Sequence, residues 1–174
     1  RVALYCGSST YVLGGAPTLS ASGGMGYYYQ SNWMDGAPGT VYVDCGSMRR
    51  TLVVDSESKA SGWDANSELF TMHLSASASN YSFGSVQLRG ARLALNVSAL
   101  SPALAIGQVS LVSSSGLTLT SDSPSSAGVV VDEVLGDGSG SVTVESGVVL
   151  EVETVQVAPL ASMAIRAGAE VLSG

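Results

Sequence analysis

The sequence predicts an all-β protein, a parallel β-helix (β-solenoid) with short strands and about 20–25 residues per coil. Three observations favour this fold. Apolar and polar residues alternate in short segments, Gly, Ser, Asp or Asn separates these segments, and similar segments recur at a nearly constant interval. The alternative is an antiparallel β-sandwich, in which strands also follow one another every 8–12 residues.

The alternation of apolar and polar residues gives the expected strands. The amino-terminal ones are VALY (2–5), TVYV (40–43), TLVV (51–54) and FTMHL (70–74). The next are SVQL (85–88), RLALNV (92–97), QVSLV (108–112), LTLT (117–120), VVVDEV (129–134), SVTV (141–144), VLEVE (149–153) and TVQV (154–157). Residues 157–172 are rich in alanine, but Pro159 and the alternation around Met163 and Ile165 favour strands over a helix there.

The spacing of apolar pairs gives the length of a coil. One series recurs at intervals of 23, 20, 21 and about 20 residues, namely Val86/Leu88, Val109/Leu111, Val129/Val131, Leu150/Val152 and Val171. A second series recurs at 25 and 21 residues, namely Leu117/Leu119, Val142/Val144 and Met163/Ile165. Each period would form one coil, and stacked coils about 4.8 Å apart would build the core that no single coil can make alone.

Composition and charge point to an extracellular or cell-surface protein. Of the 174 residues only 12% are charged, the net charge is −7 and Lys59 is the only lysine, so nucleic-acid binding is not expected. No apolar run is long enough for a transmembrane helix, and the start at Arg1 inside a strand-like segment indicates a processed chain or a fragment. Two sequons predict N-glycosylation at Asn80 and Asn96.

The two cysteines, Cys6 and Cys45, end similar segments, VALYCGS and VYVDCGS. If the two segments are neighbouring strands, their spacing of about 4.8 Å matches the Cα separation that a disulfide accepts. We therefore predict a structural disulfide that closes a 39-residue loop and contributes about 3–4 kcal/mol. Two free buried thiols or a reactive pair are the alternatives, and zinc is disfavoured because no CxxC or nearby His accompanies either cysteine.

Acidic residues recur at the ends of expected strands, at Asp44, Asp55, Asp132, Glu145 and Glu153. We interpret them as solvated turn residues that also discourage lateral aggregation. Calcium bound by Asp132 and Asp137, in and beside the loop GDGSGS (136–141), is the alternative, and no other metal or cofactor is predicted. The lone histidine, His73, is expected to be an ordinary strand residue.

Four aromatic residues gather between glycines in GGMGYYYQSNWMDG (23–36), outside any strand pattern. Tyr27, Tyr28, Tyr29 and Trp33 would cap a coil or, alternatively, form an exposed platform for a glycan or a protein partner.

Three segments carry a resemblance to a known repeat: GGAPTLSASGG (14–24), DGAPGTVYVDCGS (35–47) and RTLVVDS (50–56). Together they resemble a repeat of large β-helical extracellular proteins, which occur as adhesin-like cell-surface proteins and in algal flagellar mastigonemes. The resemblance implies a structural or adhesive role. It divides the single solenoid segment, 1–174, into a GTVY-type repeat over 1–60 with the aromatic insertion at 23–36, and regular coils over 84–174.

We therefore expect a structural protein of a filament or cell-surface appendage, in contact with other protein chains or with copies of itself. A carbohydrate-binding module that uses the aromatic insertion is the alternative. A polysaccharide-cleaving enzyme comes third, because none of the arginines shares a compact motif with paired acids and no serine lies in GxSxG, so no catalytic residue is predicted.

Overall fold

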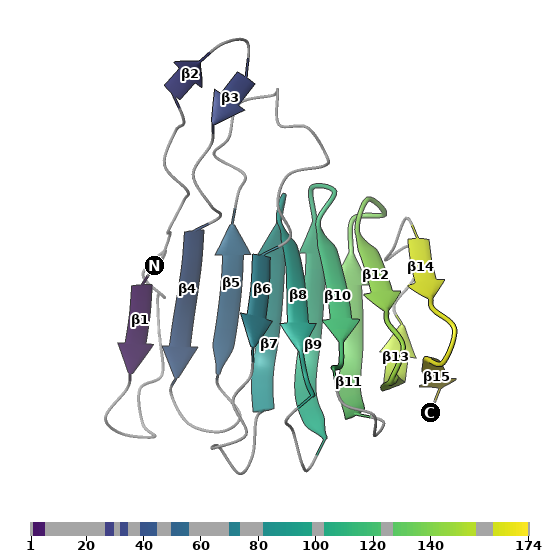
Figure 1. Ribbon diagram of the computed structural model, residues 1–174. Coiled ribbons are helices and arrows are strands. Elements are labelled where there is room, and N and C mark those ends of the chain that lie inside the picture. Colours follow the sequence, from purple (N-terminus) through teal and green to yellow (C-terminus); the bar gives the residue numbers. More distant parts are fainter. Residues whose placement is uncertain are drawn as a thin grey trace.

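The computed structural model describes residues 2–5, 27–29, 32–34, 39–44, 50–55, 70–73, 82–98, 103–122, 127–155 and 162–173. All regular elements in these ranges are β-strands, and all but one separate hairpin are stacked along one axis, with the first and last strands at opposite ends (Figure 1). No helix long and apolar enough to cross a lipid bilayer occurs in the described ranges.

The described strands are given in two groups, from the amino-terminal to the carboxy-terminal part of the chain. The former are β1 (Val2–Tyr5), β2 (Tyr27–Tyr29), β3 (Asn32–Met34), β4 (Gly39–Asp44), β5 (Thr51–Asp55) and β6 (Phe70–His73). The latter are β7 (Ser82–Arg89), β8 (Arg92–Asn96), β9 (Leu104–Val112), β10 (Gly116–Thr120), β11 (Ala127–Gly136), β12 (Ser141–Val144), β13 (Val148–Val155), β14 (Ser162–Ile165) and β15 (Glu170–Ser173).

The strands form two long sheets and a separate hairpin. One sheet has the order β1-β4-β5-β7-β9-β11-β13-β15, the other has the order β14-β12-β10-β8-β6, and β2 pairs with β3. From β5 onward all neighbouring strands in both long sheets are parallel. The prediction of a parallel β-solenoid is therefore confirmed, and the antiparallel β-sandwich is excluded.

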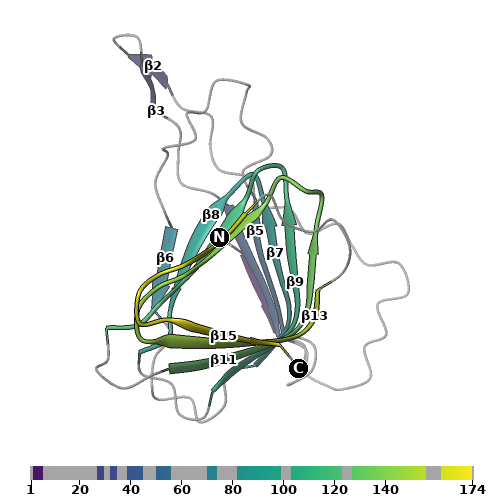
Figure 2. The same cartoon turned by 90° about the vertical axis from the view of Figure 1, so that its right-hand side faces the viewer.

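The long sheet folds into two faces, because β7, β9, β11 and β13 each bend once. Register is interrupted at the bend: Val131 pairs with Ile106 and Glu133 with Gln108, but the residues between them, Asp132 and Gly107, do not pair. We call the second sheet face A, the first arms of the bent strands with β15 face B, and the second arms with β1, β4 and β5 face C. Seen along the stacking axis, the three faces enclose a triangular core (Figure 2).

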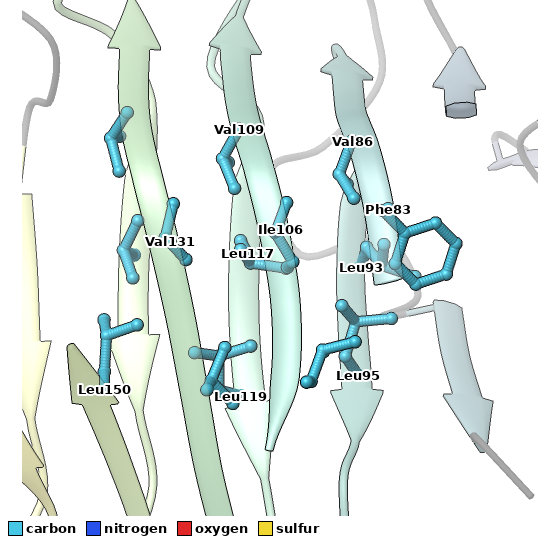
Figure 3. Packing of buried hydrophobic residues seen from close by; sticks show 14 of the residues in the cluster. Phe83, Val86, Leu93, Leu95, Ile106, Val109, Leu117, Leu119, Val131 and Leu150 are labelled. Carbon is cyan, nitrogen blue, oxygen red and sulfur yellow. The ribbon is translucent and has the colours of Figure 1, made fainter. Parts of the chain in front are cut away.

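Rows of aliphatic side chains fill this core. Along face A, Leu93, Leu117, Val142 and Met163 occupy the same level of successive strands, and the first three of these are buried. Along face C, Leu52, Val86, Val109 and Val134 do the same, and labelled members of these rows point into the interior in Figure 3. Each fully buried Val or Leu contributes about 1.5–3 kcal/mol relative to an exposed one, so the stacked rows hold the coils together.

The register corrects one of the two predicted periodic series. The series Leu117, Val142 and Met163 is confirmed, since these residues pair on neighbouring strands. In the other series Val109 pairs with Val134, whereas Val129 pairs with Leu104. The predicted series thus passed from face C to face B, because the bend at Asp132 lets a single continuous strand supply both faces.

The amino-terminal strands reverse the direction of the sheet. The predicted pairing of VALY with TVYV is confirmed, with Val2 opposite Val41, but β4 runs antiparallel to β5. Only residues 45–50 connect β4 to β5, and a parallel crossover needs a dozen or more residues. This pair is therefore a hairpin, and β1 and β4 do not continue the parallel stack as coils of the solenoid.

The corner between faces A and B is closed by stacked tight turns. The N–H of Val148 donates to the carbonyl of Glu145, and the N–H of Ala169 donates to that of Arg166. The third residue of each turn is a glycine with φ near +82°, Gly147 and Gly168, as a type II turn requires. The first turn joins β12 to β13 and the second joins β14 to β15, the two strands that confirm the prediction of strands rather than a helix in the segment 157–172.

Candidate functional site

The predicted disulfide lies outside the described residues, but the strands that precede it are described. Register between β1 and β4 ends with Tyr5 opposite Asp44. The next residue of each segment is a cysteine, Cys6 and Cys45. The backbone register of the described residues therefore supports the pairing on which the disulfide prediction depends, and the bond itself stays a prediction.

The aromatic insertion contains a β-hairpin where no strand was expected. Tyr28 is opposite Trp33 and Tyr27 is opposite Met34 in the antiparallel pair β2–β3, so the prediction that these residues lie outside any strand is wrong. Residues directly opposite in such a pair share a face, which places Tyr28 and Trp33 on the same face of the hairpin. Both views show β2 and β3 standing away from the stacked strands (Figures 1 and 2).

Of the two predicted glycosylation sites, Asn80 lies outside the described residues and Asn96 is buried, with 7% of its surface exposed. Its Nδ2, the atom that would carry the sugar, donates to a carboxylate oxygen of Asp122 one coil further on. Its Oδ1 accepts from the backbone N–H of Ser98 at 3.0 Å and from the Ser98 hydroxyl. This fold does not accommodate a glycan on Asn96, so that prediction needs correction.

The residues of this sequon instead form a clasp between coils, which sequence analysis missed. The Ser98 hydroxyl accepts from the backbone N–H of Asp122, and Val97 N–H donates to the carbonyl of Thr120 at 2.9 Å. Side chain and backbone therefore join the corner after β8 to the corner after β10. The available signal was that Asn96 ends one apolar strand and Asp122 follows the next strand of the same sheet, 26 residues further along the chain.

A second clasp joins the corner after β9 to the corner after β11, and its centre is Asp137. One carboxylate oxygen, Oδ2, accepts from Ser113 N–H at 2.8 Å across the coils. The other, Oδ1, accepts from the N–H of Ser139 at 2.9 Å and from the Ser139 hydroxyl, whose oxygen accepts in turn from Ser114 N–H at 2.7 Å.

The hydrogen bonds of this clasp stabilise the charged carboxylate of Asp137. The Ser139 hydroxyl contributes most, followed by the N–H groups of Ser113 and Ser139, and together they lower the pKa of Asp137 to about 2. Ser113 and Ser114 both have positive φ, near +57° and +59°, a conformation that non-glycine residues rarely adopt. The clasp therefore holds a corner that is unfavourable by local backbone preference.

The proposed calcium pair is not brought together. Asp132 lies at the bend between faces B and C, whereas Asp137 lies beyond the other end of the second arm, and the extended strand between them spans about 16 Å. Calcium ligands lie about 2.3–2.6 Å from the ion, so one ion cannot contact both carboxylates. Among the described residues no three His, Cys, Asp or Glu side chains are grouped closely enough to hold a metal ion.

The other acids that follow predicted strands lie in different environments. Asp132 and Glu153 are exposed at the bends of β11 and β13, in line with the interpretation as solvated residues. Asp44, in contrast, is half-buried and accepts from Arg50 Nε at 3.2 Å and from the Tyr42 hydroxyl at 3.3 Å. Calling Asp44 a solvated turn residue was wrong, because this ion pair closes the β4–β5 hairpin.

Taken together, the described polar groups join coil to coil. Gln108 Nε2 donates to Glu133 Oε2 at 2.7 Å between β9 and β11, and the buried Ser115 hydroxyl donates to the Leu88 carbonyl at 3.1 Å between successive coils. Such an arrangement resists separation of the coils.

Comparison of the chain with models of protein families, with curated proteins and with solved structures finds no match.

Proposed function

We propose that this chain is an extracellular structural or adhesive module, part of a filament or cell-surface appendage, whose task is mechanical. The observation that supports this most is the continuous series of parallel strand pairs from β5 to β15 in one sheet and from β6 to β14 in the other. Every coil is bonded to the next by backbone hydrogen bonds and buried aliphatic rows. In a stack of this kind each coil contacts only its neighbours, so the contacts between coils hold the stack together.

The corner clasps add support for a load-bearing role. Asp137 and Asn96 each bond a corner to the neighbouring corner along the axis. Separating two neighbouring coils along the axis would have to break these bonds in addition to the strand pairs. The partners in this proposal are other protein chains of the appendage or further copies of this chain.

Microscopy of native material tests this proposal. An antibody against the chain, applied to intact cells and detected by electron microscopy, should label surface appendages or the cell exterior. A pre-immune serum is the control for non-specific labelling. Label found only in the cell interior would overturn the proposal.

A carbohydrate-binding module is the second candidate, and the β2–β3 hairpin is the observation that favours it. The register places Tyr28 opposite Trp33, and two aromatic residues on one face form the kind of platform on which sugar rings stack. On a glycan array, Trp33→Ala should abolish binding that the unmodified chain shows, whereas the control Ala105→Lys, at an exposed position of β9, should retain it. Absence of binding by the unmodified chain, or equal loss in both variants, would exclude the hairpin as a glycan site.

A further inference from the structure

Charged side chains without a partner are sorted by sign over the surface of the solenoid. In the described ranges, the exposed bases that form neither an ion pair nor a side-chain hydrogen bond are Arg89 and Arg92. The exposed acids in the same condition are Asp132, Glu151, Glu153 and Glu170. Every charged residue after position 82 is described, so both sets are complete for this part of the chain.

The two arginines flank the corner between faces C and A. Arg89 ends β7, Arg92 begins β8, and Gly90, with φ near +58°, lies in the turn between them. Their register partners in the next coil are Val112 for Arg89 and Gly116 for Arg92. Neither partner supplies a counter-charge, so both guanidinium groups are available to another molecule. We call Arg89 and Arg92 the basic corner.

Three of the acids gather where face B meets face C. Asp132 and Glu153 lie at the bends of β11 and β13, and Glu151 precedes Glu153 by two residues on the outer surface of face B. Both β11 and β13 have a described strand on each side. Val130 and Ala105, which share a row with Glu151, are uncharged. We call Asp132, Glu151 and Glu153 the acidic bend.

The basic corner and the acidic bend cannot neutralise each other within one copy. They lie at different corners of the triangular section, with face C between them (Figure 2). On β7, the extended strand from the bend at Gly84 to Arg89 spans about 16 Å. Exposed charges are largely screened beyond about 8 Å at physiological ionic strength. Each set therefore favours a partner of opposite charge, and a second copy of this chain carries both.

We propose that the basic corner of one copy docks side by side on the acidic bend of a second copy. Uncharged side chains around both sets, such as Val112 and Ala105, let the surfaces approach without a like charge between them. Complementary charges of this kind determine which surfaces meet and how fast they associate. The interaction surface is thus a charged strip that selects another copy of the same chain.

The contact is heterologous, because it joins two different surfaces of the chain. A docked copy retains one unoccupied set, so further copies can add and the series extends. Along the axis, the acidic bend lies two to three strands beyond the basic corner, from β7 to β11 and β13. Copies that point the same way are therefore shifted by about 10–14 Å, which prevents closure into a flat ring.

The choice of a second copy as the partner rests on the proposed role in a filament. The two proposals can nevertheless fail separately. Antibody labelling of cells reports where the chain is located, whereas the experiments below report whether purified copies associate through the charged strip.

Sedimentation velocity over a range of concentrations tests the association. In about 20 mM salt the sedimentation coefficient should rise with concentration, and about 0.5 M salt should return it to the monomer value. Arg89→Gln with Arg92→Gln should stay monomeric. The matched control is Arg166→Glu, which lowers the net charge by the same two units at another corner and should associate normally. A monomer at every concentration, or equal behaviour of the two variants, overturns the proposal.

Exchange of the charges tests the pairing itself. Arg89→Glu with Arg92→Glu makes both sets acidic, and Asp132→Arg with Glu153→Arg makes the bend basic as well as the corner. Each variant alone should be monomeric in low salt, and an equimolar mixture should associate, because each corner then meets a bend of opposite charge. Both variants keep a net negative charge, so overall attraction does not explain association. Circular dichroism confirms that each is folded, and a mixture of folded variants that stays monomeric overturns the proposal.

Discussion

Oδ2 of Asp137 accepts a hydrogen bond from the backbone N–H of Ser113 at 2.8 Å, joining two corners that lie 24 residues apart in the chain. The bond links one coil to the next at a corner where Ser113 and Ser114 both adopt positive φ. A local preference against that backbone is thus offset by a contact from the neighbouring coil. We expect such contacts, rather than the turn sequences alone, to determine the stability of the corners.

Replacing the carboxylate of Asp137 should show how much its hydrogen bonds contribute to the stability of the fold. Asp137→Asn keeps one carbonyl oxygen but cannot accept from both Ser113 and Ser139 in the present geometry, so the melting temperature should fall by a few degrees. Asp132→Asn, an exposed carboxylate of the preceding strand, is the control and should leave it nearly unchanged. Equal melting temperatures for both variants would show that the clasp contributes nothing.

The same carboxylate predicts a dependence of stability on pH. The pKa of Asp137 is lowered to about 2 in the folded chain, below its ordinary value of 3.8, so the unfolded state binds a proton first as pH falls. The stabilisation is therefore fully present above about pH 4 and is lost as pH falls toward 2. Chemical unfolding at pH 5 and at pH 2.5 should show a loss that is smaller in Asp137→Asn. An identical loss in that variant would assign the acid sensitivity to other groups.

Close approach of two coils predicts a strict requirement for glycine at position 140. A Cβ built on Gly140 would lie 2.6 Å from the Cβ of Leu111, an atom fixed by the buried row on face C. Gly140→Ala should therefore destabilise the fold by about 1–3 kcal/mol in urea unfolding. At Gly116 the nearest atom is the Ser141 hydroxyl at 3.2 Å, which can rotate, so Gly116→Ala is the milder comparison.

Position along one core row predicts the cost of removing an aliphatic side chain. Leu117 and Met163 belong to the same row through Val142, but Leu117 is 2% exposed and Met163 is 39% exposed. Leu117→Ala should cost about 2–5 kcal/mol, because it leaves a cavity between two coils. Met163→Ala should cost clearly less, because its side chain is already partly in contact with solvent. A similar cost at both positions would contradict the difference in burial between them.

The register of β1 and β4 makes the disulfide testable by thiol counting. Titration of the denatured, unreduced chain should find no free thiol if Cys6 and Cys45 are bonded, and two free thiols would end this hypothesis. Reduction should lower stability by about 3–4 kcal/mol for a loop of this length. A Cys6→Ser, Cys45→Ser variant should match the reduced chain and should not respond to reductant.

Much of the architecture was predictable because it depends on local periodicity. Alternation at Leu117 and Leu119, repeated at Val142 and Val144, is enough to predict stacked strands that supply one core row. The reversal at β4 could also have been predicted, since residues 45–50 are too few for a parallel crossover. The bend was only partly predictable, because Gly84 and Gly107 lie at it in β7 and β9, whereas Asp132 and Glu153 occupy it in β11 and β13 without any turn signal.

The candidate sites likewise depend partly on local sequence and partly on contacts that only the fold creates. Asn96 is in a sequon, and only the fold shows that its amide is turned to Asp122 of the next coil. Asp132 and Asp137 are near one another in the chain, but an extended strand separates them by more than one ion can span. By itself the sequence determined which residues alternate and therefore which segments become strands and core, since strand periodicity is a local property. Only the tertiary structure decided which corners stack on which. A hydrogen bond between two coils joins residues more than 20 positions apart, and the number of residues in the strands and turns between them decides whether the two groups meet.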